Sequence, residues 1–462
     1  MSKSRVLVLG FDGLDWLLLN TFIKNGYLPN FKDITRSESA LKSVLLSTVP
    51  PMSPPAWASI ASGMKPEEHG IFDFLQVDKL RAKIVLSIAK FHKLTKIWNI
   101  LDQMGKRCIV LGFPLMSRPE KLNHGITVVG AFARSERMAW PAEIDLFLKR
   151  IQYNPSPYFK KFEALLYVDP DEAFRKSLAL FRERARCFLS LLKKYRWDFA
   201  FVVFSDTDLL QHFFFHEIDK MIRVYKEFDS IFRKFYESFG ESADIVIVSD
   251  HGFTAINKYV MINEILYRKG LIKLKGSPPK DGKQFIFSYE MIGKLLNIVP
   301  KALIRYFVDF LPTSRVVEKR TFSFIELDDI NLKGTWAIST SESGCVYIIR
   351  RKRNIIRETE EAIIEGASQY ILRVHHVRST HITAPDLIVE FKKGVFPQPF
   401  IKRSSPKIIY QPSELRSFIK RTGGHAPHGV FFYMGEGLVK RANVINAHEV
   451  PSILLKSLSY HE

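Results

Sequence analysis

The chain has 462 residues, of which 46% are hydrophobic, so it can bury the core of one large domain or of two ordinary ones. Lys and Arg number 68 against 48 Asp and Glu, and the formal net charge of +20 favours anionic partners such as phosphate esters, nucleic acids or acidic membrane surfaces. The sequence shows no disulfide framework, no cysteine zinc motif, no signal-peptide pattern at its start and no apolar run of about 18 residues, so we expect a cytoplasmic protein without a transmembrane segment.

The first predicted strand ends beside a carboxylate. Residues Arg5–Gly10 (RVLVLG) form a continuous apolar run typical of a buried parallel strand, and Asp12 follows it after Phe11. Open α/β sheets bind ligands just beyond the carboxyl ends of their strands. Asp12 is therefore a candidate ligand-binding residue, although an aspartate in this place could equally cap the helix predicted over Leu14–Asn25.

A proline-rich loop follows, with one hydroxyl at its centre. The segment Ser47–Gly63 (STVPPMSPPAWASIASG) has four prolines around Ser53 and runs into a helix predicted over Ala56–Gly63. Because prolines fix φ, such a loop can hold a hydroxyl still, and the start of a helix favours an anion. Ser53 is thus either a nucleophile placed to meet a phosphate or a helix-capping serine.

Strand and helix signals alternate through the first half of the chain. Buried strands are predicted at Arg107–Phe113 and Asp198–Phe204, and amphipathic helices at Asp171–Lys194 and Ile218–Phe239. The aromatic and basic stretch Tyr153–Tyr167 contains two prolines and is predicted to be a surface loop. The alternation predicts an α/β fold with a doubly wound, mostly parallel sheet and helices on both faces.

Two pairs of Asp and His follow later strands. Asp208 and His212 are four residues apart, so on a helix both project from one face and can bind one Zn²⁺-like ion. Asp250 and His251 follow the strand predicted over Asp244–Val248 after Ser249. Taken alone, the first pair could be a first-turn carboxylate with an incidental histidine, and the second could be a solvated turn.

The sequence pattern changes from about Tyr267 to Gly334. This stretch is basic, interrupted by prolines and poor in buried-strand signals, and it holds an amphipathic helix near Glu290–Leu311. We interpret residues 267–334 as a cap segment inserted within a single catalytic domain that spans residues 1–462. The apolar face of its helix could instead contact a membrane.

The C-terminal part of the chain supplies a third histidine candidate. Strands are predicted at Gly344–Ile349 and Ala384–Phe391. A glycine-rich segment follows, in which His425 is a possible metal ligand and His428 competes with it by position.

These candidate residues are expected to converge, because the carboxyl ends of the strands in a doubly wound sheet gather at one edge. Three carboxylates and three histidines suit two divalent cations, and two cations about 4 Å apart stabilise both the attacking and the leaving oxygen of an in-line displacement. The residues expected to meet are Asp12, Ser53, Asp208, His212, Asp250, His251 and His425.

In these motifs the sequence resembles the type I phosphodiesterase/nucleotide pyrophosphatase branch of the alkaline phosphatase superfamily, and it is most similar to microbial proteins described as predicted phosphohydrolases or phosphomutases. The matching motifs extend over nearly the whole chain and comprise GFDGLD (10–15), LPNF (28–31), STVPPMSPPAWASIASGMKPEEHGIFDF (47–74), SDTDLLQHFF (205–214), VSDHGF (248–253), APDL (384–387) and GGHAPHGVF (423–431).

The resemblance implies an alkaline-phosphatase-like fold and a metal-dependent phosphohydrolase that uses two divalent ions, usually Zn²⁺, with Mn²⁺ in the mutase relatives. Ser53 falls at the family's nucleophile position, and it would attack phosphorus to give a phosphoserine-type intermediate that water then hydrolyses. The ligands implied by the family are Asp12, Ser53, Asp250 and His251 for one ion, and Asp208, His212 and His425 for the other.

One departure from the family bears on the substrate. Nucleotide pyrophosphatases carry an Asn in the helix after the nucleophile, where this chain has Ala56 and Trp57. We therefore expect a small phosphate ester, either a mono- or a diester, as the substrate. A phosphomutase that uses the same phosphoserine and a catalytically inactive metal-binding relative are the alternatives. Nucleic acid is not expected as a partner, because the basic residues are scattered and form no stripes with interleaved aromatics.

Overall fold

The apolar runs of the sequence form the centre of a large sheet in the computed structural model, which describes residues 5–36, 40–158, 162–276, 324–325, 327–402, 407–416, 419–435 and 442–460. Strand β1 (Val6–Phe11) shows how the sheet is buried. Leu7 and Leu9 pack into the core on one face, and Val6 and Val8 pack into the core on the other. Successive side chains of a strand point to opposite faces, so a strand that is covered on both faces needs apolar residues throughout.

In the described part of the chain, nine strands form this sheet in the order β22-β2-β21-β9-β1-β8-β5-β6-β7. Strands β9, β1, β8, β5 and β6 run parallel to one another, whereas β21 is antiparallel to β9 and β2, and β7 is antiparallel to β6. The bounds of the remaining strands are β2 Ala40–Leu46, β5 Cys108–Phe113, β6 Gly125–Val129, β7 Ala139–Trp140, β8 Phe199–Phe204, β9 Asp244–Val248, β21 His428–Met434 and β22 Val444–Asn446.

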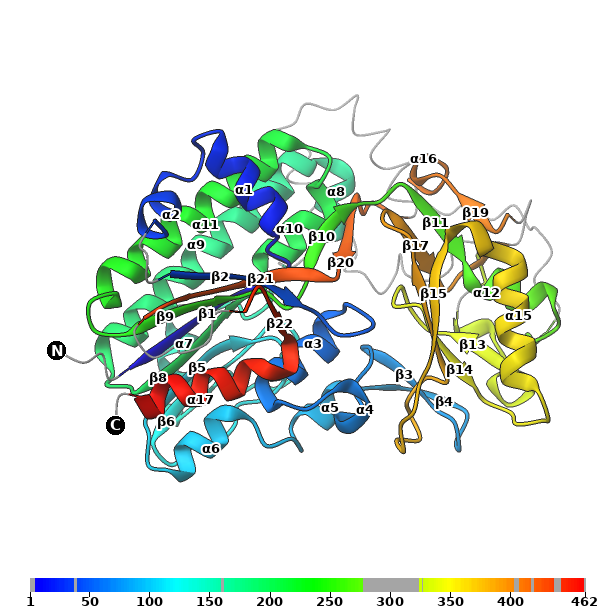
Figure 1. Ribbon diagram of the computed structural model, residues 1–462, viewed down its shortest axis with the longest axis horizontal. Helices are drawn as coiled ribbons and strands as arrows, with labels where there is room; N and C mark the ends of the chain where they lie inside the picture. The colour runs from blue at the N-terminus through cyan, green and yellow to red at the C-terminus, as the bar shows by residue number, and fades with distance from the viewer. Residues whose placement is uncertain are drawn as a thin grey trace.

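Helices cover both faces of the sheet (Figure 1). The helices on the first face are α1 Trp16–Lys24, α2 Pro29–Ile34, α7 Ala142–Arg150, α8 Phe162–Val168, α9 Pro170–Lys194, α10 Asp206–Phe214 and α11 Ile218–Phe239. Those on the second face are α3 Ser53–Ser62, α5 Ile88–Phe91, α6 Ile97–Gln103 and α17 Val450–Tyr460. This arrangement confirms the predicted α/β fold with a mostly parallel sheet.

The prediction of a surface loop over Tyr153–Tyr167 is wrong for its second half, because helix α8 begins at Phe162. Phe162 is buried, and its ring packs edge-on against Phe213 with the ring centroids 5.3 Å apart. Tyr153 is also buried. The aromatic residues that suggested an irregular surface segment instead fill the core beneath α9.

A smaller lobe lies beside the large one, and the antiparallel pair β10 (Gly252–Ala255) and β20 (Gly423–Ala426) leads into it (Figure 1). Its main sheet has the order β13-β14-β16-β15, and helices α12 (Ile262–Arg268) and α15 (Ile355–Ala367) contribute to the same apolar core. The bounds of the other small-lobe elements are β11 Lys258–Met261, β12 Phe324–Ile325, β13 Ala337–Ser339, β14 Cys345–Ile348, β15 Ile371–His376, β16 Leu387–Phe391, β17 Val395–Gln398, β18 Ile401–Lys402, β19 Ile409–Tyr410 and α16 Pro412–Leu415.

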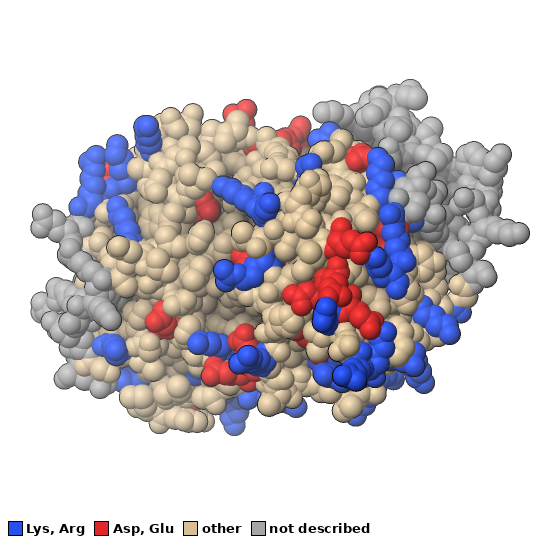
Figure 2. Space-filling model, turned by 45° about the vertical axis from the view of Figure 1, so that its right-hand side comes forward, with Lys and Arg blue, Asp and Glu red and all other residues tan. Residues whose placement is uncertain are grey.

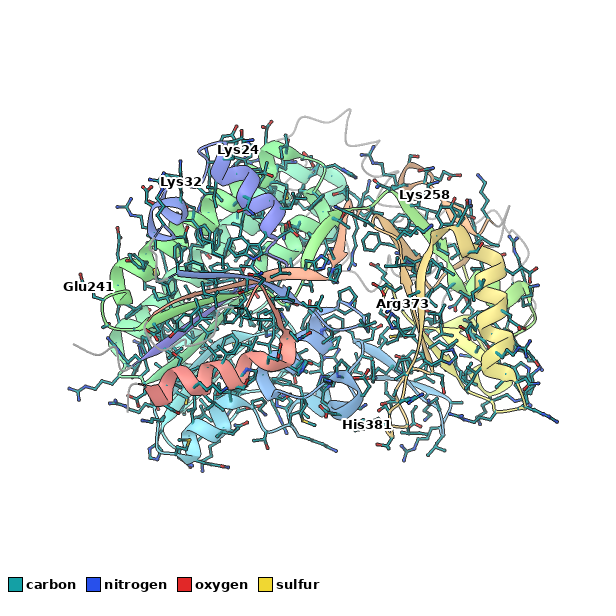
Figure 3. All side chains as sticks on the ribbon, in the orientation of Figure 1. Lys24, Lys32, Glu241, Lys258, Arg373 and His381 are labelled. Carbon is teal, nitrogen blue, oxygen red and sulfur yellow. The ribbon has the colours of Figure 1, made fainter. Side chains whose placement is uncertain are left out.

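Contacts between the two lobes involve a hairpin and a short helix of the large lobe. Helix α4 (Pro66–His69) precedes the hairpin of β3 (Leu75–Asp78) and β4 (Lys83–Leu86). From the small lobe, the ring of His381 reaches the carbonyl oxygen of Glu68 at 2.8 Å, and Figure 3 shows His381 at the lower edge of that lobe. Most of the cap predicted over residues 267–334 lies outside the described residues, namely residues 277–323 and 326. These include the helix expected near Glu290–Leu311. The single-domain assignment with a cap stays a prediction.

The surface of the protein carries charged side chains of both signs. On the face shown in Figure 2, the largest group of Asp and Glu lies right of centre with Lys and Arg beside it, and other charged side chains of both signs are spread among uncharged residues. The helices that the structure describes include none with the length and apolar character needed to cross a membrane.

Candidate active site

The candidate residues lie at one edge of the large sheet. Asp12 follows β1, and Asp250 and His251 follow β9, which is parallel to β1. The helix after β8 carries Asp208 and His212. Because these strands are parallel neighbours, their carboxyl ends place the side chains together.

The first group consists of Asp12, Asp250 and His251, whose ligand atoms all lie within 4.8 Å of one another. His251 Nε2 is 3.5 Å from Asp12 Oδ1 and 3.2 Å from Asp250 Oδ2. Ser53 Oγ lies beside the group, 3.1 Å from His251 Nε2 and 3.4 Å from Asp12 Oδ1. All four side chains are buried.

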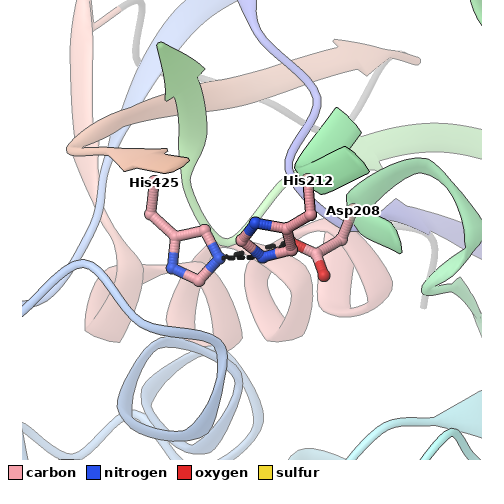
Figure 4. Close-up of side chains that lie close together, drawn as sticks. All are labelled: Asp208, His212 and His425. Atoms are coloured by element: carbon pink, nitrogen blue, oxygen red, sulfur yellow. Dashed lines mark hydrogen bonds and ion pairs between the residues drawn. The ribbon is translucent and has the colours of Figure 1, made fainter. Parts of the chain in front are cut away.

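The second group consists of Asp208, His212 and His425 (Figure 4). Nε2 of each histidine lies 3.3 Å from Asp208 Oδ1, and the two Nε2 atoms are 2.9 Å apart. The rings of His425 and His251 stack with their centroids 3.8 Å apart, so the two groups adjoin. His428, the alternative to His425, belongs to neither group and its side chain is exposed.

Hydrogen bonds fix which histidine nitrogens face the two groups. His212 Nδ1 lies 3.0 Å from the carbonyl oxygen of Gly423, and His251 Nδ1 lies 3.1 Å from that of Gly252. A carbonyl oxygen can only accept, so Nδ1 carries the proton in both rings. The lone pair of each Nε2 therefore points into its group, which is the tautomer that a metal ligand requires.

Helix α3 positions Ser53 and explains why its start is stiff. The helix begins at Ser53, three residues earlier than the sequence predicts, because Pro54 and Pro55 fit its first turn. The helix ends at Gly63, whose φ of +76° is favourable only for glycine. Every side chain from Ser53 to Ala61 is buried, so packing holds the serine in place.

Trp57 contacts the first group, a contact that sequence reasoning missed. Its Nε1–H donates a hydrogen bond to Asp12 Oδ2 at 3.1 Å, while Oδ1 of the same carboxylate faces Ser53 and His251. The indole packs against Gly10, where an added Cβ would lie only 2.7 Å from its Cη2 atom. The glycine in β1 followed by an aspartate is a sequence signal for this close approach.

Burial and mutual repulsion dominate the electrostatics of the first group. Burial, together with the negative charge of Asp250, raises the pKa of Asp12 well above its usual range. Burial also raises the pKa of Asp250 to about 7, and the charge of Asp208 adds to this effect. The pKa of His251 is held well below its usual value by burial and by the neighbouring His425. The imidazole is therefore neutral, as a ligand must be.

In the second group, the neighbouring side chains lower the pKa of the carboxylate instead of raising it. Burial alone would raise the pKa of Asp208, but the imidazoles of His212 and His425 hold it well below its usual range. Burial lowers the pKa of His425. An ionised carboxylate facing nitrogen lone pairs is typical of a cation site.

Two buried carboxylate oxygens without hydrogen-bond donors allow a test of whether metal ions fit these groups. Asp208 Oδ1 and Asp250 Oδ2 are buried and accept no well-aligned hydrogen bond from the residues that the structure describes. The Nε2 atoms of His212 and His251 lie 3.3 and 3.2 Å from them, but these nitrogens present lone pairs and donate no proton. Buried carboxylate oxygens without donors are costly unless a cation satisfies them, and carboxylate with imidazole suits both zinc and manganese. The residues fit one divalent ion in each group.

The sequence of this chain is similar to that of a known protein family. The sequence profile described as type I phosphodiesterase / nucleotide pyrophosphatase matches residues 6–362. No match was found among curated proteins.

Solved structures with similar folds cover nearly the whole chain. Phosphonoacetate hydrolase from Sinorhizobium meliloti 1021, in complex with phosphonoformate, has a TM-score of 0.60 at 14% identity and covers 100% of this chain and 96% of its own. Human ectonucleotide pyrophosphatase / phosphodiesterase 5 has a TM-score of 0.54 at 13% identity and covers 98% of this chain and 95% of its own. The inactive murine counterpart in complex with AMP has a TM-score of 0.55 at 14% identity and covers 99% and 95%. These likenesses show the fold, in agreement with the alkaline-phosphatase-like fold that the sequence predicts.

Proposed function

This chain belongs to the type I phosphodiesterase/nucleotide pyrophosphatase family, a family of metal-dependent hydrolases, and from that premise we propose that it hydrolyses a small phosphoric ester with Ser53 as the nucleophile. One observation carries the proposal. The Ser53 hydroxyl lies 3.1 Å from His251 Nε2 and 3.4 Å from Asp12 Oδ1, beside a buried ligand group. A merely capping serine would not need this position.

The metal ligands in this proposal are Asp12, Ser53, Asp250 and His251 for one divalent ion, and Asp208, His212 and His425 for the other. When bound, the two ions, for which the donor set suits Zn²⁺ and Mn²⁺ alike, supply positive charge that neutralises a phosphate and lowers the pKa of a serine hydroxyl.

The residues of the chain perform the rest of the reaction. Ser53 Oγ attacks phosphorus, so a bond between serine oxygen and phosphorus forms as the bond to the leaving alcohol breaks. Water then cleaves the phosphoserine and returns the serine hydroxyl with release of the phosphoryl product. Helix α3 aims its positive N-terminal end at the anion, which favours both steps.

The departure at Ala56 leaves no side-chain amide where nucleotide pyrophosphatases have one, and Ala56 is fully buried. The proposal therefore covers phosphatase and phosphodiesterase activity without preferring a nucleotide.

Metal content and turnover test the proposal together. The purified protein is loaded with zinc or with manganese and assayed on 4-nitrophenyl phosphate and on bis(4-nitrophenyl) phosphate. We expect about two ions per chain and release of nitrophenolate from at least one of the esters. Protein that binds no metal would contradict the proposal.

Ser53→Ala separates covalent catalysis from metal binding. The variant should keep metal and lose about 10³-fold or more in kcat, and intact-mass analysis of the wild type during turnover should detect phosphoserine. Ser62→Ala is the matched control, because Ser62 lies on the same helix and its hydroxyl contacts backbone groups away from the ligand groups, donating to the carbonyl oxygen of Ala58 and accepting from the N–H of Met64. Transfer of the phosphoryl group from Ser53 to a second hydroxyl of the substrate, without release of free phosphate, would identify a phosphomutase.

A further inference from the structure

A cavity of about 430 Å³ lies between the two lobes and reaches His212 and His425 of the second ligand group. Its size is in the range of pockets that bind small organic molecules, about 300–1,000 Å³. The large lobe contributes residues of α1 and of the loop before Ser53, and the small lobe contributes residues of β15 to β17. A group attached to a phosphate at the ligand groups would extend into this cavity.

The rim of the cavity exposes large apolar side chains to solvent. Leu17 of α1 is 64% exposed, Leu372 of β15 is 62% exposed, and Val49 of the loop before Ser53 is 39% exposed. Single exposed apolar residues are ordinary on a protein surface, but these three come from separate elements and line one cavity, so an apolar group bound there would cover all three. Phe253 and Phe396 line the cavity as well.

The lining of the cavity is mostly apolar. Its described members include the carboxylates of Glu342 and Glu390 and no Asn, Gln or Arg side chain. Lys392 and Lys393 are exposed residues of the lining, and the ammonium group of Lys392 donates to the carbonyl oxygen of Gln369. The positive charge for the phosphate end would come from the ions of the two ligand groups. The cavity thus presents an apolar wall next to a site for an anion.

We propose that the organic group of the substrate is apolar, an alkyl chain on the phosphate, and that Leu17 and Leu372 determine this specificity from opposite lobes. The inference rests on the proposed phosphoric-ester hydrolysis. The phosphate end lies at the two ligand groups, and the chain lies along the apolar wall. Each methylene that leaves water for such a wall strengthens binding, so affinity rises with chain length.

Binding of inert alkylphosphonates tests the inference without turnover. The metal-loaded full-length protein is titrated calorimetrically with methylphosphonate and with octylphosphonate, and we expect octylphosphonate to bind at least about tenfold more tightly. Leu17→Ser and Leu372→Ser should each weaken octylphosphonate binding about fivefold or more and leave methylphosphonate unchanged. Both leucines are more than half exposed, so the variants should fold.

The matched control is Leu146→Ser on α7, because Leu146 is also 64% exposed but does not line the cavity. It should leave both affinities unchanged. Equal affinity for the two phosphonates in a protein that still hydrolyses nitrophenyl esters would overturn the inference and leave the proposed function standing. A protein that binds neither phosphonate and hydrolyses no ester would overturn both.

Discussion

Ser53 Oγ and His251 Nε2 lie 3.1 Å apart, although the two residues are separated by 198 positions in the chain. One comes from the start of α3 and the other from the turn after β9. Their contact joins the candidate nucleophile to the first ligand group. Through the stacked ring of His425, the same histidine joins that group to the second. The serine therefore lies where both proposed ions could act on a phosphate that it attacks.

Replacing Asp250 should remove metal and activity together. Asp250→Asn keeps the shape of the side chain but removes the charge that faces His251 and Asp12. We expect the affinity for the first ion to fall about 100-fold or more and activity to fall in parallel. Metal titration followed by equilibrium dialysis measures the first effect, and nitrophenolate release measures the second. Asp219→Asn, on the exposed surface of α11, should change neither, and a fully metallated but inactive Asp250→Asn protein would contradict the ligand assignment.

Trp57→Phe should weaken metal binding while the fold persists. The change removes the hydrogen bond from the indole N–H to Asp12 Oδ2, so the carboxylate loses the contact that orients it. Partners of this kind typically contribute 10- to 100-fold in affinity, so we expect a loss of about tenfold. Isothermal titration with Zn²⁺ or Mn²⁺ measures it.

Trp98→Phe provides the matched control, because Trp98 is buried in the same core and its N–H donates to Glu120 Oε2 at 3.0 Å, away from the ligand groups. It should cost similar stability in a thermal melt and leave metal affinity unchanged. If both variants weaken metal binding equally, the Trp57 effect is one of packing and not of orientation.

The sequence predicted the elements that have strong local signals. The strand Asp244–Val248 and the helix Ile218–Phe239 occur with the predicted bounds, because continuous apolar runs and a long 3.6-residue period leave little ambiguity. The ligand groups could also be expected, since parallel strands bring their carboxyl ends together. The structure does bring the seven candidate residues together, and their roles stay a prediction.

Other features depend on contacts that no local pattern encodes. Helix α8 was missed because its aromatic residues resemble those of an irregular segment until their partners on other helices are known. Trp57 appears in the sequence only as an apolar helix residue, and its hydrogen bond to Asp12 depends on the close approach of α3 to Gly10. The cavity between the lobes is formed by residues as distant as Leu17 and Leu372, so its shape could not be read from either segment.

The junction of the two lobes should respond to pH through Asp73. This carboxylate of the large lobe is buried and accepts hydrogen bonds from the hydroxyls of Ser341 and Ser343 in the small lobe, the latter at 2.6 Å. Burial raises its pKa to about 6, even though the two serines favour the ionised form. A carboxyl whose pKa is higher in the folded state binds its proton more tightly there, so its stabilising effect is complete below pH 4 and is lost as the pH rises to about 6.

Asp73→Asn isolates this effect. The amide keeps an acceptor for the serines and cannot ionise, so relative to the variant the wild type should lose up to about 3 kcal/mol of unfolding free energy between pH 4 and pH 7. Urea unfolding of both proteins at several pH values measures the difference, and Asp33→Asn on the exposed end of α2 is the control. A difference that is constant over this range would show that Asp73 does not titrate there.

A buried ion pair should stabilise the position of α10, the helix that carries two residues of the second ligand group. The guanidinium of Arg184 bonds Asp206, the first residue of α10, and both side chains are almost completely buried. Arg184 also donates to the carbonyl oxygens of Asn154 and Ser156 at 3.0 and 2.8 Å. Removing one partner of such a pair leaves an uncompensated buried charge, which typically costs about 3–5 kcal/mol.

Arg184→Ala should therefore lower the unfolding free energy by about that amount and weaken the second metal site with it. Arg186→Ala is the control, because Arg186 is an exposed arginine on the same helix as Arg184, and it should change the unfolding free energy by less than about 0.5 kcal/mol. Chemical denaturation and metal titration of both variants decide the matter, because equal stabilities would mean that the Arg184–Asp206 pair contributes no more than a surface charge.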